Sequence, residues 1–179
     1  MNDWNVVVSI YQGGFRRAIR ALGELGPVER SPYHNVLVMK VENTAALLEA
    51  VERKTDENTA LYDAISRVAP AMRTVEFHSM AEFRDRLKPI LFEWSPQLTG
   101  RSFHVRIHRR GDGRSLSTPD AERLLDNLVL DATAATDKPG KVSFTDPDAV
   151  IAVDTIDSWA GIALWRREDL RRHRLLRPD

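Results

Sequence analysis

The spacing of apolar residues changes repeatedly along this chain between two periods, and this alternation constrains the fold more than any other feature. Phe103, Val105 and Ile107 alternate with polar residues, which is typical of a half-buried strand. Within residues 80–94, apolar side chains instead recur every three or four positions, which is typical of an amphipathic helix. The chain has 179 residues, of which 42% are hydrophobic, enough to bury a core. The pattern therefore predicts a globular fold of the α+β class.

The first 78 residues predict the element order β-α-β-β-α-(α)-β. The strands are expected at residues 4–11, 27–30, 35–41 and 72–77. The helices are expected after Gly14, from Asn43 or Thr44 onward, and through Leu61, Ile65 and Val68. This order is that of a ferredoxin-like domain, in which two helices cover one face of an antiparallel sheet. We therefore predict a ferredoxin-like domain over residues 1–78.

Residues 79–168 predict a second domain of α/β type. It opens with the amphipathic helix of residues 80–94, and the strand of residues 103–108 follows. Thr118 is expected to cap another helix, with Pro119 at its first position. Three short strands are expected at residues 142–144, 150–154 and 160–165. The remaining segment, residues 169–179, is predicted to be an arginine-rich tail.

The chain has no cysteine, which excludes disulfide scaffolds, cysteine-based zinc sites and thiol nucleophiles. Its longest unbroken apolar run, residues 149–153, is far shorter than the roughly 20 residues that cross a bilayer. The first residues lack the basic and apolar regions of a secretory signal. The sequence therefore predicts a cytoplasmic protein without a membrane partner.

Charge is balanced over the whole chain, with 26 basic and 26 acidic residues, but it is not evenly distributed. Residues 101–114 hold five arginines and one acid, and residues 166–177 hold six arginines and two acids. Because the planar arginine side chain grips phosphate with two hydrogen bonds, both windows favour a phosphate-bearing partner. The alternative is that these arginines pair with the thirteen acids of residues 101–179 on a solvated face.

Common catalytic motifs are missing from the sequence, and so are the glycine-rich motifs that bind phosphates or dinucleotides. His104 and His108 lie on the expected strand, where they are about 13 Å apart and too distant to share a metal ion. We therefore predict no catalytic residue, no metal and no cofactor. Two alternatives stay open. One is a small enzyme that uses Asp146, Asp148 and Asp154 on a nucleotide or phosphorylated substrate, and the other is an adaptor whose arginine tail meets an acidic protein.

Three segments of the second half together resemble the THUMP domain. They are FHVRIHRRG at residues 103–111, VSFTDPDAVIAV at residues 142–153 and GIAL at residues 161–164. The shared pattern is an F-x-V-R-x-x-R-R strand, a V-x-[LF]-x-[ND]-P-D turn, a β-branched strand and a final strand with Gly-Ile. Asp146 stands where asparagine is common. In particular the chain looks like the stand-alone THUMP proteins that assist tRNA cytidine acetylation, in which a ferredoxin-like domain precedes the THUMP domain.

The resemblance implies an RNA-binding module that docks on the acceptor stem and 3′ end of tRNA. THUMP domains usually accompany a methyltransferase, thiouridine synthase, deaminase or pseudouridine synthase domain, and two small domains leave no room for one here. We therefore expect a protein that is not itself an enzyme and presents tRNA to a separate modifying enzyme. The expected RNA contacts are Arg106, His108, Arg109, Arg110 and Arg114, with Lys138, Lys141, Arg166 and Arg167 as outer contacts. Strict alternation turns Arg109 toward the core side.

Overall fold

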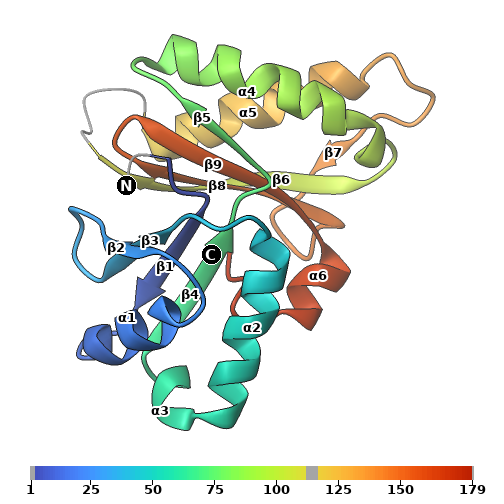
Figure 1. Cartoon of the computed structure of the whole chain (residues 1–179). Helices are drawn as coiled ribbons and strands as arrows, with labels where there is room; N and C mark the ends of the chain where they lie inside the picture. The colour runs from blue at the N-terminus through green and yellow to red at the C-terminus, as the bar shows by residue number, and fades with distance from the viewer. Residues whose placement is uncertain (1–2, 112–116, 179) are drawn as a thin grey trace. The chain divides into compact units, whose positions relative to one another are not determined.

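The chain forms two compact units in the computed structural model, which describes residues 3–111 and 117–178. One unit comprises the residues up to Met72 together with Leu170–Arg177, and the other comprises Arg73–Asp169 with Pro178. Each unit contains one β-sheet with helices, so the expected mixed α+β class is confirmed (Figure 1). The division falls six residues before the position expected from the sequence.

The sheet of the first unit has four strands in the order β2-β3-β1-β4, and every neighbouring pair is antiparallel. Its strands are β1 (Val6–Ile10), β2 (Val28–Arg30), β3 (Val36–Met39) and β4 (Ile65–Pro70). Strand β1 is central, and the side chains of Val6, Val7 and Val8 are fully buried. Both faces of β1 are therefore covered, which explains why its sequence is a continuous apolar run rather than an alternating one.

Three helices accompany this sheet: α1 (Phe15–Gly23), α2 (Thr44–Glu57) and α3 (Thr59–Tyr62). Asparagine side chains form the N-caps of two of these helices. Asn43 accepts a hydrogen bond from the amide of Ala46, and Asn58 accepts one from the amide of Leu61. These caps satisfy amides that have no partner inside the helix.

One expected element of the first half is wrong, and another is present but belongs to the other sheet. The spacing of Leu61, Ile65 and Val68 predicts a helix, but α3 ends at Tyr62 and residues 65–70 form β4. Ile65 and Val68 are β-branched and buried, and β4 supplies the second antiparallel neighbour of β1. Because β4 occupies that position, the strand expected at residues 72–77 instead forms β5 (Arg73–Glu76) in the other sheet, paired with β9.

The sheet of the second unit has five strands in the order β5-β9-β8-β6-β7. Besides β5 these are β6 (Ser102–Arg110), β7 (Lys141–Val142), β8 (Ala149–Ile156) and β9 (Trp159–Arg166). Strand β6 runs parallel to β7 and β8, whereas β9 is antiparallel to both β8 and β5. The strand expected at residues 142–144 is therefore reduced to the two residues of β7.

Helices α4 (Met80–Trp94) and α5 (Thr118–Thr133) lie side by side over one face of this sheet (Figure 1), and the short 3-10 turn η1 (Ser95–Gln97) follows α4. Leu87, Leu91 and Leu125 from the helices pack with Val105 and Ile151 from the strands in one fully buried cluster. The cap of α5 is Ser117 rather than the expected Thr118, and its side chain accepts a hydrogen bond from the amide of Asp120. Among the described helices, none is both long and apolar enough to cross a bilayer.

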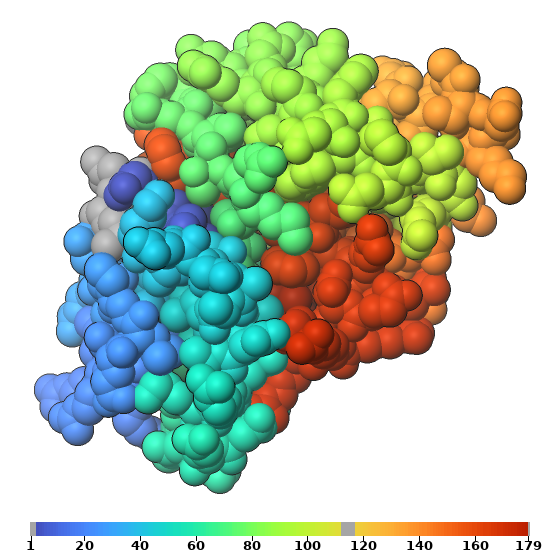
Figure 2. All heavy atoms as spheres, turned by 45° about the vertical axis from the view of Figure 1, so that its right-hand side comes forward, coloured from blue at the N-terminus to red at the C-terminus, as the bar shows by residue number. Residues whose placement is uncertain are grey.

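The C-terminal residues do not form a separate tail in the structure. After α6 (Arg167–Arg172), the chain packs into the first unit, where Leu175 and Leu176 are buried. The amide of Val68 donates to the carbonyl of Leu175 over 2.9 Å, and Arg67 Nε donates to the carbonyl of Arg177. Figure 2 shows the red C-terminal atoms beside the teal atoms of α2. This segment therefore adds to the folded core of the first unit.

Candidate nucleic-acid interface

Strand β6 carries four of the nine expected RNA contacts, and its alternation decides where they point. Phe103, Val105 and Ile107 belong to the buried cluster under α4 and α5. Because successive side chains point to opposite faces of a sheet, His104 and Arg106 lie on the face away from these helices. The expected alternating strand is therefore present in the second unit, but His104 is buried rather than on an exposed face.

The side chains toward the C-terminal end of β6 have partners within the protein. Arg110 Nη1 lies 3.0 Å from Asp154 Oδ1 on β8, and these two side chains are only 16% and 6% exposed. Arg106 Nη1 lies 3.9 Å from Glu122 Oε1 on α5. His108 Nε2 lies 2.8 Å from the carbonyl oxygen of Pro178. Much of the charge of this end is thus balanced internally.

One further expected contact belongs to the same end of β6. Arg109 is half-buried and lines an open groove of about 540 Å³ together with His78 and Asp157. Arg114 lies outside the described residues.

His104 is buried and organises the segment that follows β7. Its Nδ1 lies 3.0 Å from the carbonyl oxygen of Ser143, and its ring centroid is 5.6 Å from that of Phe144. The Phe144 side chain is 71% exposed, which makes it the most exposed large apolar side chain among the described residues. The histidine therefore supports an aromatic ring that faces solvent.

The other end of the sheet gathers exposed cations. In register, Lys141 pairs with Ser102, and Phe103 pairs with Ala149, which in turn faces Arg166. Lys138 lies against Gly100, directly before β6. The side chains of this group are exposed, and we call them the basic edge: Arg101, Lys138, Lys141 and Arg166. Within the described part of the chain, neither lysine has an acidic partner within 4 Å.

Three of the expected outer contacts thus come together in the basic edge: Lys138, Lys141 and Arg166. Arg101 lies in the first charge window but was not among the expected RNA contacts, and Phe144 was not expected at the site. The signal for Phe144 was its position between β7 and the D-P-D turn, where a large apolar residue has no strand neighbour to cover it.

Arg167 departs from the other outer contacts because acids surround it. Its Nε lies 3.0 Å from Asp146 Oδ1, and its Nη2 lies 3.2 Å from Asp148 Oδ1. Asp148 also accepts hydrogen bonds from the amide and the hydroxyl of Ser102, which lower the pKa of its carboxyl. Asp146 has a φ of 43°, a left-handed conformation that aspartate tolerates in turns. Arg167 and Ser102 therefore hold the D-P-D turn beside the basic edge.

The three carboxylates of the enzyme alternative do not form one site. Asp146 and Asp148 pair with Arg167 before β8 begins, whereas Asp154 pairs with Arg110 six residues further along. Six strand residues correspond to about 20 Å. The acid and base of a hydrolytic reaction act much closer together than this.

Two acids on α5 hold the free side of β6. Asp126 Oδ1 accepts a hydrogen bond from the amide of Val105 over 2.8 Å, and Glu122 Oε1 accepts one from the amide of Ile107 over 2.8 Å. Because β7 is so short, these strand amides have no strand neighbour on that side. Burial raises the pKa of Asp126 to about 6, a net shift in which the hydrogen bond from the Val105 amide acts in the lowering direction and the charge of Glu122 in the raising direction. Strand β6 is therefore fixed on both sides.

Two arginines of the second charge window pair with acids of α2. Arg172 Nη2 lies 3.3 Å from Glu49 Oε1, and Arg174 Nη2 lies 2.6 Å from Asp56 Oδ1. Between them, His173 Nδ1 lies 2.8 Å from Glu52 Oε2. The adaptor alternative required these arginines to meet an acidic partner protein, but here their acidic partner is α2 of the same chain.

Comparison with known proteins gives matches among structures only. No family model and no curated protein sequence matches the chain. It is similar to PH1313 from Pyrococcus horikoshii, with a TM-score of 0.61 and 17% identity over 90% of this chain and 54% of that one. It is also similar to TrmN from Thermus thermophilus, with a TM-score of 0.55 and 14% identity over 89% and 44% of the two chains.

A third similar structure is a 4-thiouridine synthetase in complex with RNA and with bound ATP. The TM-score is 0.55 and the identity 16%, over 90% of this chain and 40% of that one. A possible methylase from Clostridium difficile 630 has a TM-score of 0.59 and 15% identity over the same shares. The chain thus spans about half of PH1313 and about two-fifths of these enzymes.

The prediction that this protein is not an enzyme is wrong in its reasoning from domain size. Similar structures include methylases and a thiouridine synthetase, so the fold belongs to a group that contains enzymes. The small size of the two domains, which leaves no room for a separate catalytic domain in this chain, is therefore not evidence against an enzymatic activity.

Methyltransferases and thiouridine synthases are also the enzyme classes that the sequence resemblance associates with THUMP domains. At identities below 20% the likeness concerns the fold, and it extends over about nine-tenths of this chain. The comparisons therefore support a THUMP-type α+β fold for this chain.

Proposed function

We propose that this chain binds tRNA and supplies the RNA-binding step of a tRNA modification. The observation that carries the proposal is the basic edge beside the exposed ring of Phe144, at one end of the second sheet. The 4-thiouridine synthetase of similar fold was solved in complex with RNA, which supports RNA as the ligand class. The antiparallel order β2-β3-β1-β4 supports a ferredoxin-like first unit, as expected from the resemblance.

The chemistry of the basic edge suits a stem that ends in a single strand. An A-form stem offers phosphates and 2′-hydroxyls, which lysine and arginine bind without reading sequence. A single-stranded end offers unstacked bases, and an exposed aromatic ring stacks on them. Lys141 stands three residues before Phe144, and Lys138 and Arg166 lie at the same end of the sheet, so a ligand with both parts suits this end of the unit. The acceptor stem and 3′ end of tRNA have these two parts.

The other expected RNA contacts stay predictions. They are Arg106, His108, Arg109, Arg110, Arg114 and Arg167. The class of modification stays open as well: methylation, thiolation and acetylation each need a catalytic domain, which we place in the same or a partner polypeptide.

A titration of fluorescently labelled tRNA at two salt concentrations tests the proposal. Replacing both lysines, K138Q/K141Q, should weaken binding about fivefold per lost phosphate contact near 0.15 M salt and reduce the salt slope by about two. R172Q is the matched control, because Arg172 lies in an arginine-rich segment but pairs with Glu49. Binding that is undetectable, insensitive to salt or unchanged in K138Q/K141Q would overturn the proposal.

Phe144→Ala separates the two parts of the ligand. It should weaken binding of tRNA with an intact 3′ end and have little effect on tRNA whose single-stranded end has been removed, because only the former offers a base to stack. Equal effects on both ligands would contradict the stacking role.

A further inference from the structure

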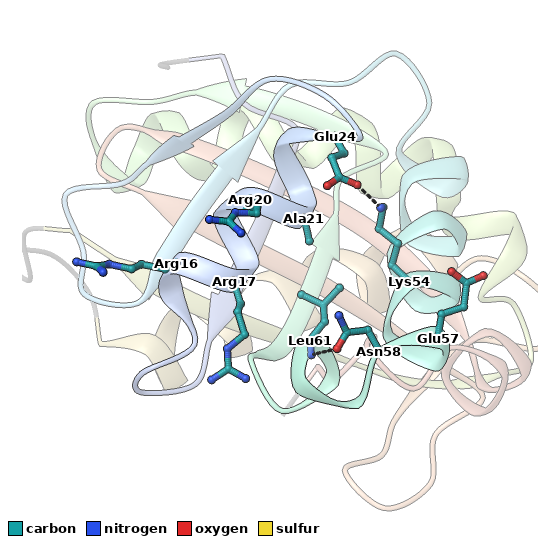
Figure 3. Close-up of a pocket in the computed structure, with 9 residues that line it drawn as sticks. All are labelled: Arg16, Arg17, Arg20, Ala21, Glu24, Lys54, Glu57, Asn58 and Leu61. Carbon is teal, nitrogen blue, oxygen red and sulfur yellow. Dashed lines mark hydrogen bonds and ion pairs between the residues drawn. The ribbon is translucent and has the colours of Figure 1, made fainter.

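The first unit contains a charged groove that the proposed interface does not use. The groove has a volume of about 550 Å³ and lies between α1 on one side and α2 with α3 on the other. Figure 3 shows three arginines along α1 and, across from them, Lys54 and Glu57 on α2. The charged side chains that line it are Arg16, Arg17, Arg20, Lys54, Glu24 and Glu57. Cations therefore outnumber acids by two in this groove.

The internal pairing of the groove leaves two arginines for a ligand. Lys54 Nζ lies 2.6 Å from Glu24 Oε2, and Arg17 Nη1 donates to the carbonyl of Ala60 over 2.9 Å. Within the part of the chain that the structure describes, Arg16 and Arg20 have no acidic partner within 4 Å, and both side chains are exposed. They lie one helical turn apart, about 6 Å along α1.

Arg16 is placed where it disfavours the helix that carries it, whereas Arg20 lies in the last turn, where a cation is favourable. The amino end of a helix dipole is positive, and α1 has no acid in its first turn and no capping side chain. Arg16 and Arg20 also form a like-charged pair at i and i+4, which is unfavourable in an isolated helix. A sequence that breaks local helix rules without a structural gain indicates a functional role at that position.

A glycine fixes the start of α1 against the groove wall. A Cβ at Gly14 would lie 2.7 Å from the Cα of Ala64, so only glycine permits this approach. The amide of Tyr11 donates to the carbonyl of Ala64 over 2.9 Å, and the amide of Gly14 donates to the carbonyl of Tyr11. The first turn of α1 is therefore held next to α3, and the arginines are positioned by backbone contacts.

We infer that this groove binds phosphates of an RNA backbone, as a second contact that rests on the proposed function. Arginine binds phosphate through two parallel hydrogen bonds, and the free amides of the first turn of α1 add further donors. The lining contains no aromatic residue, and its apolar members are only Ala21 and Leu61. A nucleobase would have no ring to stack on, so the chemistry fits phosphate groups rather than a whole nucleotide.

Charge variants of the full chain test this inference by tRNA titration at two salt concentrations. R16Q/R20Q should weaken binding about fivefold per lost phosphate contact near 0.15 M salt and reduce the salt slope by about two. E24Q should tighten binding, because it removes a carboxylate that competes for Lys54 and Arg20. R53Q is the matched control, because Arg53 is exposed on α2 but does not line the groove.

The outcomes distinguish this inference from the proposed function. If wild type binds tRNA, K138Q/K141Q weakens it and R16Q/R20Q equals R53Q, the groove inference alone is overturned. If wild type does not bind tRNA, the proposed function fails and this inference fails with it. Inorganic phosphate is the second probe: if it shifts the amide signals of Arg16 and Arg17 while R16Q/R20Q leaves tRNA affinity unchanged, the groove takes free phosphate and the RNA assignment is overturned.

Discussion

The two arginine-rich windows carry the same net charge in the sequence, but their arginines make different contacts in the structure. In residues 166–177, Arg172 and Arg174 pair with acids of α2, and the segment around them packs into the first unit. In residues 101–114, Arg110 is held by Asp154, whereas Arg101 is exposed at the basic edge. The difference is set by which acids the fold brings within reach. Charge density along the sequence therefore identifies a binding surface only after these acids are counted.

Lysines outside both windows sharpen the same comparison. Lys138 and Lys141 were expected as outer contacts, and they stand in no basic run of the sequence. The structure places them in the basic edge, and no described acid pairs with them within 4 Å. Part of the exposed charge of the basic edge thus comes from lysines that stand outside the arginine-rich windows.

The strongest test of the comparison removes the apolar anchor of the second window. Leu175→Ala should lower the free energy of unfolding of the first unit by about 3 kcal/mol, because it leaves a cavity at a fully buried position. Thermal or urea unfolding measures the change. Arg172→Ala is the control and should cost less than about 0.5 kcal/mol, since its pair with Glu49 is exposed. Equal losses in the two variants would contradict the packing role of the segment.

A second test removes the internal ion pair of the first window. Arg110→Ala should cost about 2 kcal/mol of stability, because it leaves the buried carboxylate of Asp154 with one charge partner fewer. The double variant R110A/D154A should recover part of this loss, because no charge is then left behind. Urea unfolding of wild type, both single variants and the double variant measures the coupling. Full additivity would show that the pair contributes no coupling energy.

A smaller effect on stability is expected from Asp126, which accepts a hydrogen bond from β6, the strand that contains most of the first window. The folded-state pKa of Asp126 is raised to about 6 from an ordinary value of 3.8, so the folded state binds this proton more tightly between these values. The contribution of Asp126 to the free energy of unfolding therefore increases on acidification and is lost as the pH rises through about 6. Between pH 7 and pH 5 wild type should gain about 1 kcal/mol relative to Asp126→Asn. Urea unfolding at both pH values measures this difference, and parallel pH profiles would contradict the assignment.

Local patterns predicted much of the second unit. The alternation of Phe103, Val105 and Ile107 fixes β6 and its buried face, and the three-to-four spacing in residues 80–94 fixes α4. The cap of α5 was displaced by one residue, because Ser117 and Thr118 are both good caps and only the tertiary position of the chain selects one.

Features that depend on long-range pairing could not be read from the sequence. Ile65 and Val68 fit a helix by spacing, and only their pairing with β1 makes them a strand. The basic edge depends in the same way on the register of β6 with β7 and β8 and of β8 with β9. The groove arginines on α1 were missed because the first hundred residues carry a net charge near zero, which hides a local cluster.

The docking of residues 170–177 into the first unit has a consequence for the order of folding during synthesis. Arg67 and its hydrogen-bond acceptor, the carbonyl of Arg177, are separated by 110 positions. Ribosomes add about 5–20 residues per second. The segment that covers β4 is therefore synthesised roughly 5–20 s after Met72, and the first unit cannot be completed before then. During that interval the apolar edge of β4 is a natural substrate for chaperones, and the second unit is free to fold first.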